Sequence, residues 1–136
     1  YYDQLVAIKN KLPISENQIR ISFKWQDALD KGKMLGGKKV LALSKAGYEQ
    51  ACVLFNVGAW SSELAITQAL DQDDGLKKAV RYLQLSSGAF EHLKENVYSM
   101  MGCDTTPDLY PQTLAFFSVL MIAQANELTL AKGVKE

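Results

Sequence analysis

Cysteine and histidine are scarce in this sequence, and their scarcity excludes several kinds of site. Two cysteines among 136 residues are too few for a disulfide scaffold and indicate a reducing compartment. Cys52 lies in an apolar run, which predicts a small core residue, and no neighbour of Cys103 would activate its thiol. The single histidine, His92, lies between Glu91 and Lys94 and is expected at a solvated or rim position. One histidine cannot form a multi-histidine metal site, so no metal is expected.

An excess of charge of either sign is also missing. The 15 basic residues balance the 15 acidic ones, so nucleic-acid binding is not expected, because it requires surplus Lys and Arg. The first residues contain neither the basic nor the apolar region of a signal peptide, and no initiator Met, so we expect a segment of a longer protein. The uncharged stretch 114–126 has thirteen residues, fewer than the roughly 18 of a membrane span, and predicts a buried core helix.

Two glycine-containing stretches come close to ligand-binding motifs without completing them. Residues 32–39 almost match the phosphate-binding loop Gly-x4-Gly-Lys-Ser/Thr, but Lys39 replaces the hydroxyl residue, and an apolar run follows where a helix should begin. Residues 71–75 do not supply the ligands of an EF-hand, and Asp73 or Asp74 is instead expected to cap a helix. No combination of Ser, His and acid can be singled out. The sequence therefore predicts no catalysis and no cofactor.

The first third of the chain has the pattern of a short helix followed by a small sheet. At 136 residues the chain forms one domain at most. Residues 1–11 predict the end of a helix. Within the region 19–44, apolar residues occupy every second position from Ile19 to Trp25, which predicts a half-buried strand, and 40–43 predicts another. The fourteen residues between these strands contain three glycines and favour a hairpin-like connection, so the sheet should be antiparallel.

The rest of the chain has helical periodicity. It predicts helices over about 46–70, 74–101 and 111–132, with Gly102 ending the second and Pro111 in the first turn of the third. Small residues recur inside these helices and permit close packing. The predicted fold is mainly α: a tetratricopeptide-like antiparallel helical solenoid with a small antiparallel β-sheet. The apolar face expected for the helix 46–70 comprises Cys52, Phe55, Ala59 and Ile66, widened by Val53, Val57, Trp60 and Leu64. The apolar set expected for the helix 74–101 includes Leu76, Val80, Leu83, Phe90, Leu93, Val97 and Met101.

The loop 31–39 is the one functionally suggestive segment outside the helices. Met34 and Leu35 lie between glycines and are surrounded by four lysines. Apolar side chains at the tip of a basic loop can enter a partner's groove or an anionic membrane interface. The alternative is that both side chains fold back onto the sheet, and the sequence leaves these two possibilities open.

Taken in order, several stretches resemble the BRO domain of the ALIX family of ESCRT-associated adaptors. The resemblance covers the whole chain, and its specificity lies in the order and spacing of the stretches rather than in any one of them. The stretches are Tyr1-Tyr2-Asp3-Gln4, Ser15-Glu16-Asn17-Gln18-Ile19, Phe23-Lys24-Trp25-Gln26-Asp27-Ala28, Gly47-Tyr48-Glu49, Cys52-Val53-Leu54-Phe55-Asn56, Gly75-Leu76-Lys77, Ser87-Gly88-Ala89-Phe90 and Ala123-Gln124-Ala125-Asn126-Glu127.

The resemblance implies a curved, mainly helical domain more than twice as long as this chain, of which 1–136 would be an internal fragment. It implies an adaptor without catalytic activity. Such a domain binds the C-terminal amphipathic helix of an ESCRT-III subunit of the charged multivesicular body protein four type. The implied localisation is cytoplasmic, with recruitment to endosomes and the midbody and a role in viral budding. The alternative is a generic helical-solenoid scaffold that binds other peptides.

Carried over residue by residue, the resemblance implies a partner-binding groove formed by Asp73, Lys77, Arg81, Thr129 and Lys132. The spacing 73, 77, 81 independently places three of these on one helix face, although a solvated face has the same pattern. The family has a large aromatic residue where this sequence has Thr129, so altered binding is expected. The resemblance also matches Leu35 to an exposed phenylalanine implicated in viral budding and membrane contact.

Overall fold

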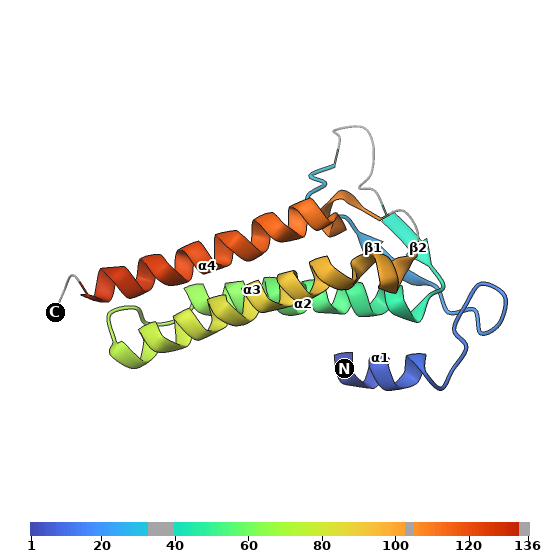
Figure 1. Ribbon diagram of the computed structural model, residues 1–136, viewed down its shortest axis with the longest axis horizontal. Helices are drawn as coiled ribbons and strands as arrows, with labels where there is room; N and C mark the ends of the chain where they lie inside the picture. The colour runs from blue at the N-terminus through green and yellow to red at the C-terminus, as the bar shows by residue number, and fades with distance from the viewer. Residues whose placement is uncertain (33–39, 103–104, 134–136) are drawn as a thin grey trace.

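The computed structural model describes residues 1–32, 40–102 and 105–133, and Met34, Leu35 and Cys103 lie outside these ranges. The described part is mainly helical, with a two-stranded antiparallel sheet, which confirms the predicted fold class (Figure 1). Three long helices lie side by side, with α3 in contact with both of the others. The elements are α1 (Tyr2–Lys9), β1 (Phe23–Gln26), β2 (Val40–Leu43), α2 (Ala46–Ile66), α3 (Asp73–Met101), the 3-10 turn η1 (Pro107–Leu109) and α4 (Pro111–Gly133).

Two predicted helix-end signals, at Gly102 and Pro111, are confirmed, and the predicted cap of α3 is not. Gly102 ends α3 in the left-handed conformation, with φ of 60°, and Pro111 is the first residue of α4, both as predicted. The predicted cap of α3 is wrong, because Asp73 and Asp74 lie inside the first turn and Gln72 precedes it. Their carboxylates pair with lysines one turn later instead of binding the helix amides.

The helix α2 ends at Ile66 rather than near residue 70, because residues up to Ala69 belong to the turn that leads into α3. A Cβ atom on Gly75 would lie 2.1 Å from the carbonyl oxygen of Ala69, so the start of α3 contacts the backbone of the turn directly. Only glycine permits this approach. The turn therefore has to include Ala69, and α2 stops before it.

The core lies between α2, α3 and α4. Aromatic rings connect the three helices: the ring centroids of Phe55 and Phe90 are 5.4 Å apart, and those of Phe90 and Phe117 are 5.3 Å apart. The ring of Phe90 lies against Gly58, where an added Cβ atom would be 2.8 Å from it. Cys52 is buried in this core, as predicted. The small residues of the sequence therefore make room for aromatic side chains as well as for the neighbouring backbone.

The predicted apolar face of α2 is too wide. Trp60 and Ile66 are 67% and 71% exposed, and Val57 and Leu64 are exposed too. α3 covers one side of α2, and α1 contacts it on another side. The hairpin covers a further part of α2 near Phe55. No described element covers the surface that carries Trp60 and Ile66, so apolar composition alone overestimated burial.

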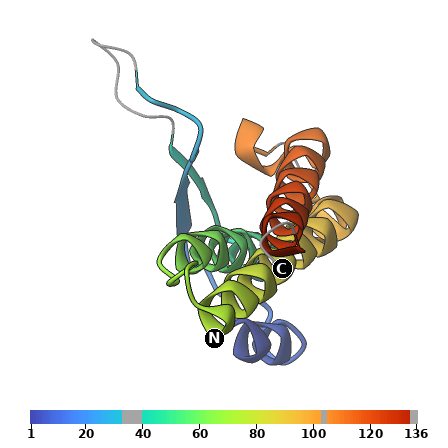
Figure 2. The same ribbon diagram turned by 90° about the vertical axis from the view of Figure 1, so that its left-hand side faces the viewer.

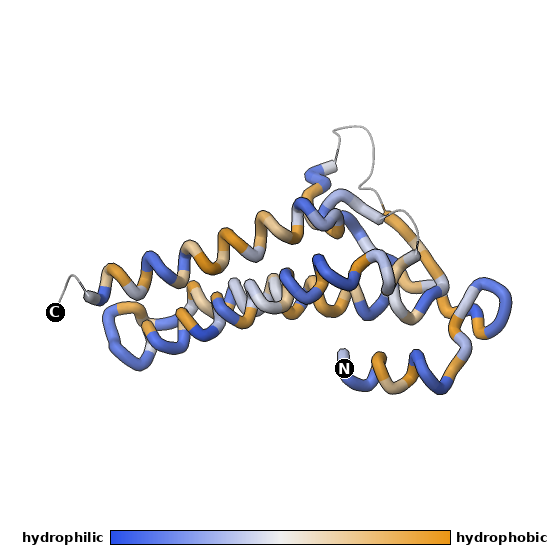
Figure 3. Tube along the Cα trace, in the orientation of Figure 1, coloured by the Kyte–Doolittle hydropathy of each residue, from blue (hydrophilic) through white to orange (hydrophobic). Residues whose placement is uncertain are grey.

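The prediction that 114–126 forms a buried core helix is also wrong. α4 buries one narrow face, formed by Leu114, Ser118, Met121 and Ala125, against α3. Phe116, Val119 and Ile122 are exposed, and Figure 3 shows hydrophobic residues along the whole of this helix. By length and composition alone α4 could cross a membrane, a test that core helices of soluble proteins also pass.

The two strands form a hairpin that projects from the helices (Figure 2). Phe23 pairs with Leu43 and Trp25 with Leu41, and these four side chains pack against the core. The predicted strand 19–25 is therefore too long at its start. β2 has only four residues to pair with, so residues 19 and 21 lie outside the ladder and are exposed.

Candidate functional site

The five residues predicted for the groove lie together where the start of α3 meets the end of α4. Lys77, Arg81, Thr129 and Lys132 line one pocket of about 520 Å³. Asp73 and Lys132 line an adjoining pocket of about 360 Å³. We call the two pockets together the α3–α4 groove. Its other lining residues are Leu70, Asp71, Gln72, Asp74, Leu76, Lys78, Val80, Leu128 and Ala131.

Asp73 links the two helices at the centre of the groove. Its Oδ2 lies 2.6 Å from Nζ of Lys77 on the same helix, and its Oδ1 forms an ion pair with Lys132 on α4. The hydrogen bond from Lys132 and then that from Lys77 lower the pKa of Asp73 from 3.8 to about 2. The carboxylate therefore stays ionised at neutral pH and holds both ammonium groups at the rim of the groove.

The lowered pKa of Asp73 predicts an acid-dependent loss of this contact. Because the pKa is lower in the folded chain, the contact stabilises the fold above pH 3.8 and loses this effect as the pH falls through about 2. A carboxyl-carbon NMR titration should show a midpoint near 2, and Lys132→Met should raise it. Lys24→Met, on the hairpin, should leave it unchanged. A midpoint near 3.8 in the unmodified chain would contradict the observed geometry.

The rim of the groove carries lysines and an arginine as well as aspartates, and its floor is apolar. Lys78 pairs with Asp74 at 2.6 Å, whereas Arg81 has no ion pair in the described part of the chain. Leu76 and Val80, one turn apart on α3, provide half-buried apolar surface between the charges. The sequence placed these two residues on the apolar face of their helix but did not assign them to the groove. Their positions directly beside Lys77 and Arg81 are the signal that could have done so.

Thr129 contributes a small side chain to the groove. Its hydroxyl donates a hydrogen bond to the carbonyl of Ala125, 2.9 Å away in the same helix. This satisfies the hydroxyl group's donor locally, so the residue does not require a partner for it. The expected effect of Thr129 on binding stays a prediction.

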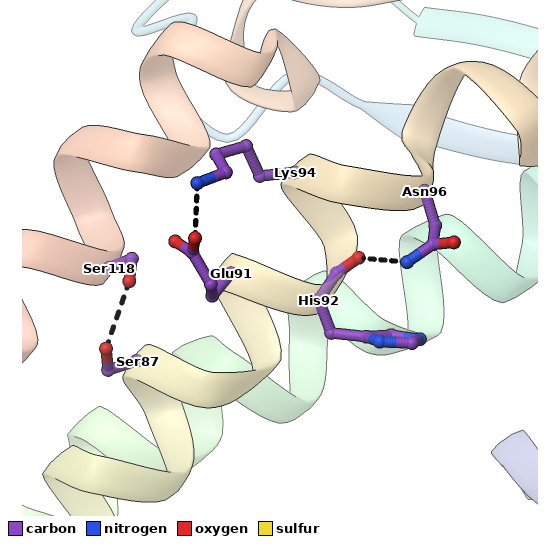
Figure 4. A network of polar contacts seen from close by, with 6 residues as sticks. All are labelled: Ser87, Glu91, His92, Lys94, Asn96 and Ser118. Carbon is purple, nitrogen blue, oxygen red and sulfur yellow. Dashed lines mark hydrogen bonds and ion pairs between the residues drawn. The ribbon is translucent and has the colours of Figure 1, made fainter.

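The remaining chemically interesting residues do not join the groove. His92 is exposed, as predicted, and Figure 4 shows its ring directed away from the ion pair of Glu91 and Lys94. Burial raises the pKa of the Cys52 thiol, so this residue stays protonated and unreactive. Among residues 1–32, 40–102 and 105–133, no group of three or more His, Cys, Asp or Glu side chains could hold a metal ion.

Comparison with known proteins places the whole chain in one family. A family model described as a BRO1-like domain matches residues 1–136. The chain is 47% identical over 136 residues to human programmed cell death 6-interacting protein, and the match covers 100% of this chain and 16% of that protein. The chain thus spans about one sixth of the length of this relative.

Two solved structures are similar to the chain in sequence and in fold. One is described as the ALIX BRO1 CHMP4C complex, with a TM-score of 0.93 and 48% identity over 98% of this chain and 38% of that one. The other is ALIX in complex with the SIVmac239 PYKEVTEDL late domain, with a TM-score of 0.90 and 48% identity over 98% of this chain and 19% of that one. The chain therefore belongs to the BRO1-like domain family.

Proposed function

We propose that this chain is a non-enzymatic adaptor module that binds, in the α3–α4 groove, the C-terminal amphipathic helix of an ESCRT-III subunit. The observation that carries the proposal is the groove itself, an apolar floor between α3 and α4 with lysines and an arginine at its rim. A similar domain that is 48% identical has been solved in complex with CHMP4C, which supports a partner of the charged multivesicular body protein four type.

The groove has the chemistry that an acidic amphipathic helix requires. Apolar anchors spaced three or four residues apart on such a helix would bury their side chains against Leu76 and Val80. Glutamates or aspartates flanking the anchors would meet Lys77 and Arg81 at the rim. Exposed charges of this kind accelerate the encounter more than they increase the affinity. Asp73 would act by positioning, because it holds two of the cations in place.

The family relationship also supports a place of action. We propose that the module works in the cytoplasm and is recruited to endosomes and the midbody, where it carries the ESCRT-III subunit to sites of membrane scission and budding. A contact of the loop 31–39 with a membrane or a viral protein stays a prediction, because Met34 and Leu35 lie outside the described residues.

Charge reversal at Lys77 tests the proposal. Titration of an acidic, leucine-rich amphipathic peptide against the chain should give saturable binding, and Lys77→Glu should weaken it about 5- to 10-fold. An exposed ion pair contributes about 1 kcal/mol, and 1.4 kcal/mol corresponds to a factor of ten in affinity. Isothermal calorimetry and fluorescence anisotropy both measure this change.

Lys24→Glu provides the matched control, because it makes the same change of charge on β1, away from the groove. It should leave the affinity within twofold of the unmodified value. If the peptide does not bind, or if both variants weaken binding equally, the groove assignment fails. Equal binding of neutral and acidic amphipathic peptides would instead favour the generic solenoid scaffold.

A further inference from the structure

A buried carboxylate connects the hairpin to the helices. Asp108 lies in η1, directly before α4, and is 0% exposed. Its Oδ2 accepts a hydrogen bond from the indole Nε1 of Trp25 and another from the backbone N–H of Ala28, both at 2.8 Å. Both donors belong to the hairpin segment, about 80 residues earlier in the chain. One oxygen atom therefore fixes two points of the hairpin.

Apolar contacts hold the hairpin against the helices. They do little to fix the direction of its strands relative to the helices. One face of the hairpin packs on the core, and the ring of Trp25 meets that of Phe55 edge to face at 5.4 Å. Apolar burial is non-directional, whereas a hydrogen bond constrains both distance and angle. A two-stranded hairpin is marginal on its own, so its contacts with the body decide how it is oriented. Figure 2 shows that the two strands stand beside the helical body rather than between its helices.

Because its side chain is completely buried, Asp108 depends on these two hydrogen bonds. No Lys, Arg or His in the described ranges forms an ion pair with the carboxylate. Within the described part of the chain, its second oxygen, Oδ1, has no hydrogen-bond partner, and neither has the buried hydroxyl of Thr106. A buried charge is tolerated only when hydrogen bonds compensate for the lost water. The two hairpin donors provide this compensation, and a rotated hairpin would withdraw both of them.

We propose that Asp108 is the positioning residue that sets the direction of the β1–β2 hairpin relative to the helical body. The role is distinct from partner binding in the α3–α4 groove, since the hairpin and η1 lie at the opposite end of α4 from Thr129 and Lys132 (Figure 1). Asp108 acts through hydrogen bonds to the hairpin, and the aromatic contact of Trp25 supplies the packing.

The test measures the direction of the hairpin separately from the stability of the helices. Spin labels at Lys24→Cys on β1 and His92→Cys on α3, both exposed positions, report the distance between hairpin and body in a chain that also carries Cys103→Ser. Asp108→Ala should broaden this distance distribution, while amide hydrogen exchange in α2 and α3 stays as slow as in the parent. Asp108→Asn should keep the distribution narrow, because its amide oxygen still accepts both hydrogen bonds.

Two further variants make the result decisive. Trp25→Phe removes the indole donor and keeps a ring against Phe55, so it should also broaden the distribution, and it decides the question if Asp108→Ala does not fold. Thr113→Val removes a hydrogen bond to Pro107, 2.8 Å long, that does not reach the hairpin, and it should change nothing. A narrow distribution in both Asp108→Ala and Trp25→Phe overturns the proposal. Equal acceleration of exchange throughout α2 and α3 also overturns it.

Discussion

Phe90→Ala is expected to lower the free energy of unfolding by about 3–5 kcal/mol, the range for removing a buried aromatic ring. Phe90 is 4% exposed and lies between Phe55 and Phe117, so its loss leaves a cavity in contact with α2, α3 and α4. Gly58 cannot fill that space, since it has no side chain. A domain with about 5–15 kcal/mol of total stability would lose a large part of it. Urea denaturation followed by far-UV circular dichroism measures the change.

Phe116→Ala is the matched control, because it removes the same side chain from a position that is 61% exposed. Its effect should stay within about 0.5 kcal/mol, as for other surface substitutions. If the two variants are destabilised to the same extent, the aromatic contacts do not form the centre of the core.

Gly47→Ala should destabilise the chain by about 1–3 kcal/mol or more, although it adds one methyl group. The added Cβ atom would lie 2.0 Å from the carbonyl oxygen of Met100, so the first turn of α2 must move away from the last turn of α3. Met100 presents backbone rather than a flexible side chain, and no rotamer change can relieve the overlap. Thermal and urea unfolding of the variant measure this cost.

Gly88→Ala makes the same change in the middle of α3, where a Cβ atom would have no described neighbour within 4 Å. It should stabilise the chain by about 0.5–1 kcal/mol, because alanine is the better helix former. The two alanine substitutions should thus have effects of opposite sign. A destabilisation of equal size at both positions would show that the close approach at Gly47 has no energetic consequence.

Periodicity predicted the buried face of α3 well and that of its neighbours poorly. Leu83, Phe90 and Val97 are buried, as their spacing indicates, because α3 lies between two other helices. Trp60 on α2 and Phe116 on α4 also lie in helices rich in apolar residues, yet both are exposed. A sequence pattern gives the width of an apolar face, but it does not say how much of that face another element covers.

Part of the α3–α4 groove could be predicted from the sequence. The spacing 73, 77, 81 defines one helix face by helical geometry alone. Thr129 and Lys132 could be added only through the family resemblance, because they approach α3 from a helix about 50 residues later. The ion pair between Asp73 and Lys132 depends on how α3 and α4 cross. Asp108 gave no signal, since a single acid in a turn is ordinarily solvated, and here it is completely buried.

The ion pair between Asp73 and Lys132 also affects the stiffness of the groove. α4 packs mainly on α3. In the last turn of α4, Lys132 forms an ion pair with Asp73 in the first turn of α3. Both side chains are partly solvated, so dissolved ions weaken their attraction. Rising ionic strength should therefore loosen the C-terminal end of α4 at the same time as it screens the lysines and the arginine of the rim. A ligand carboxylate that binds Lys132 would also break the ion pair with Asp73, so the end of α4 could shift as the ligand docks.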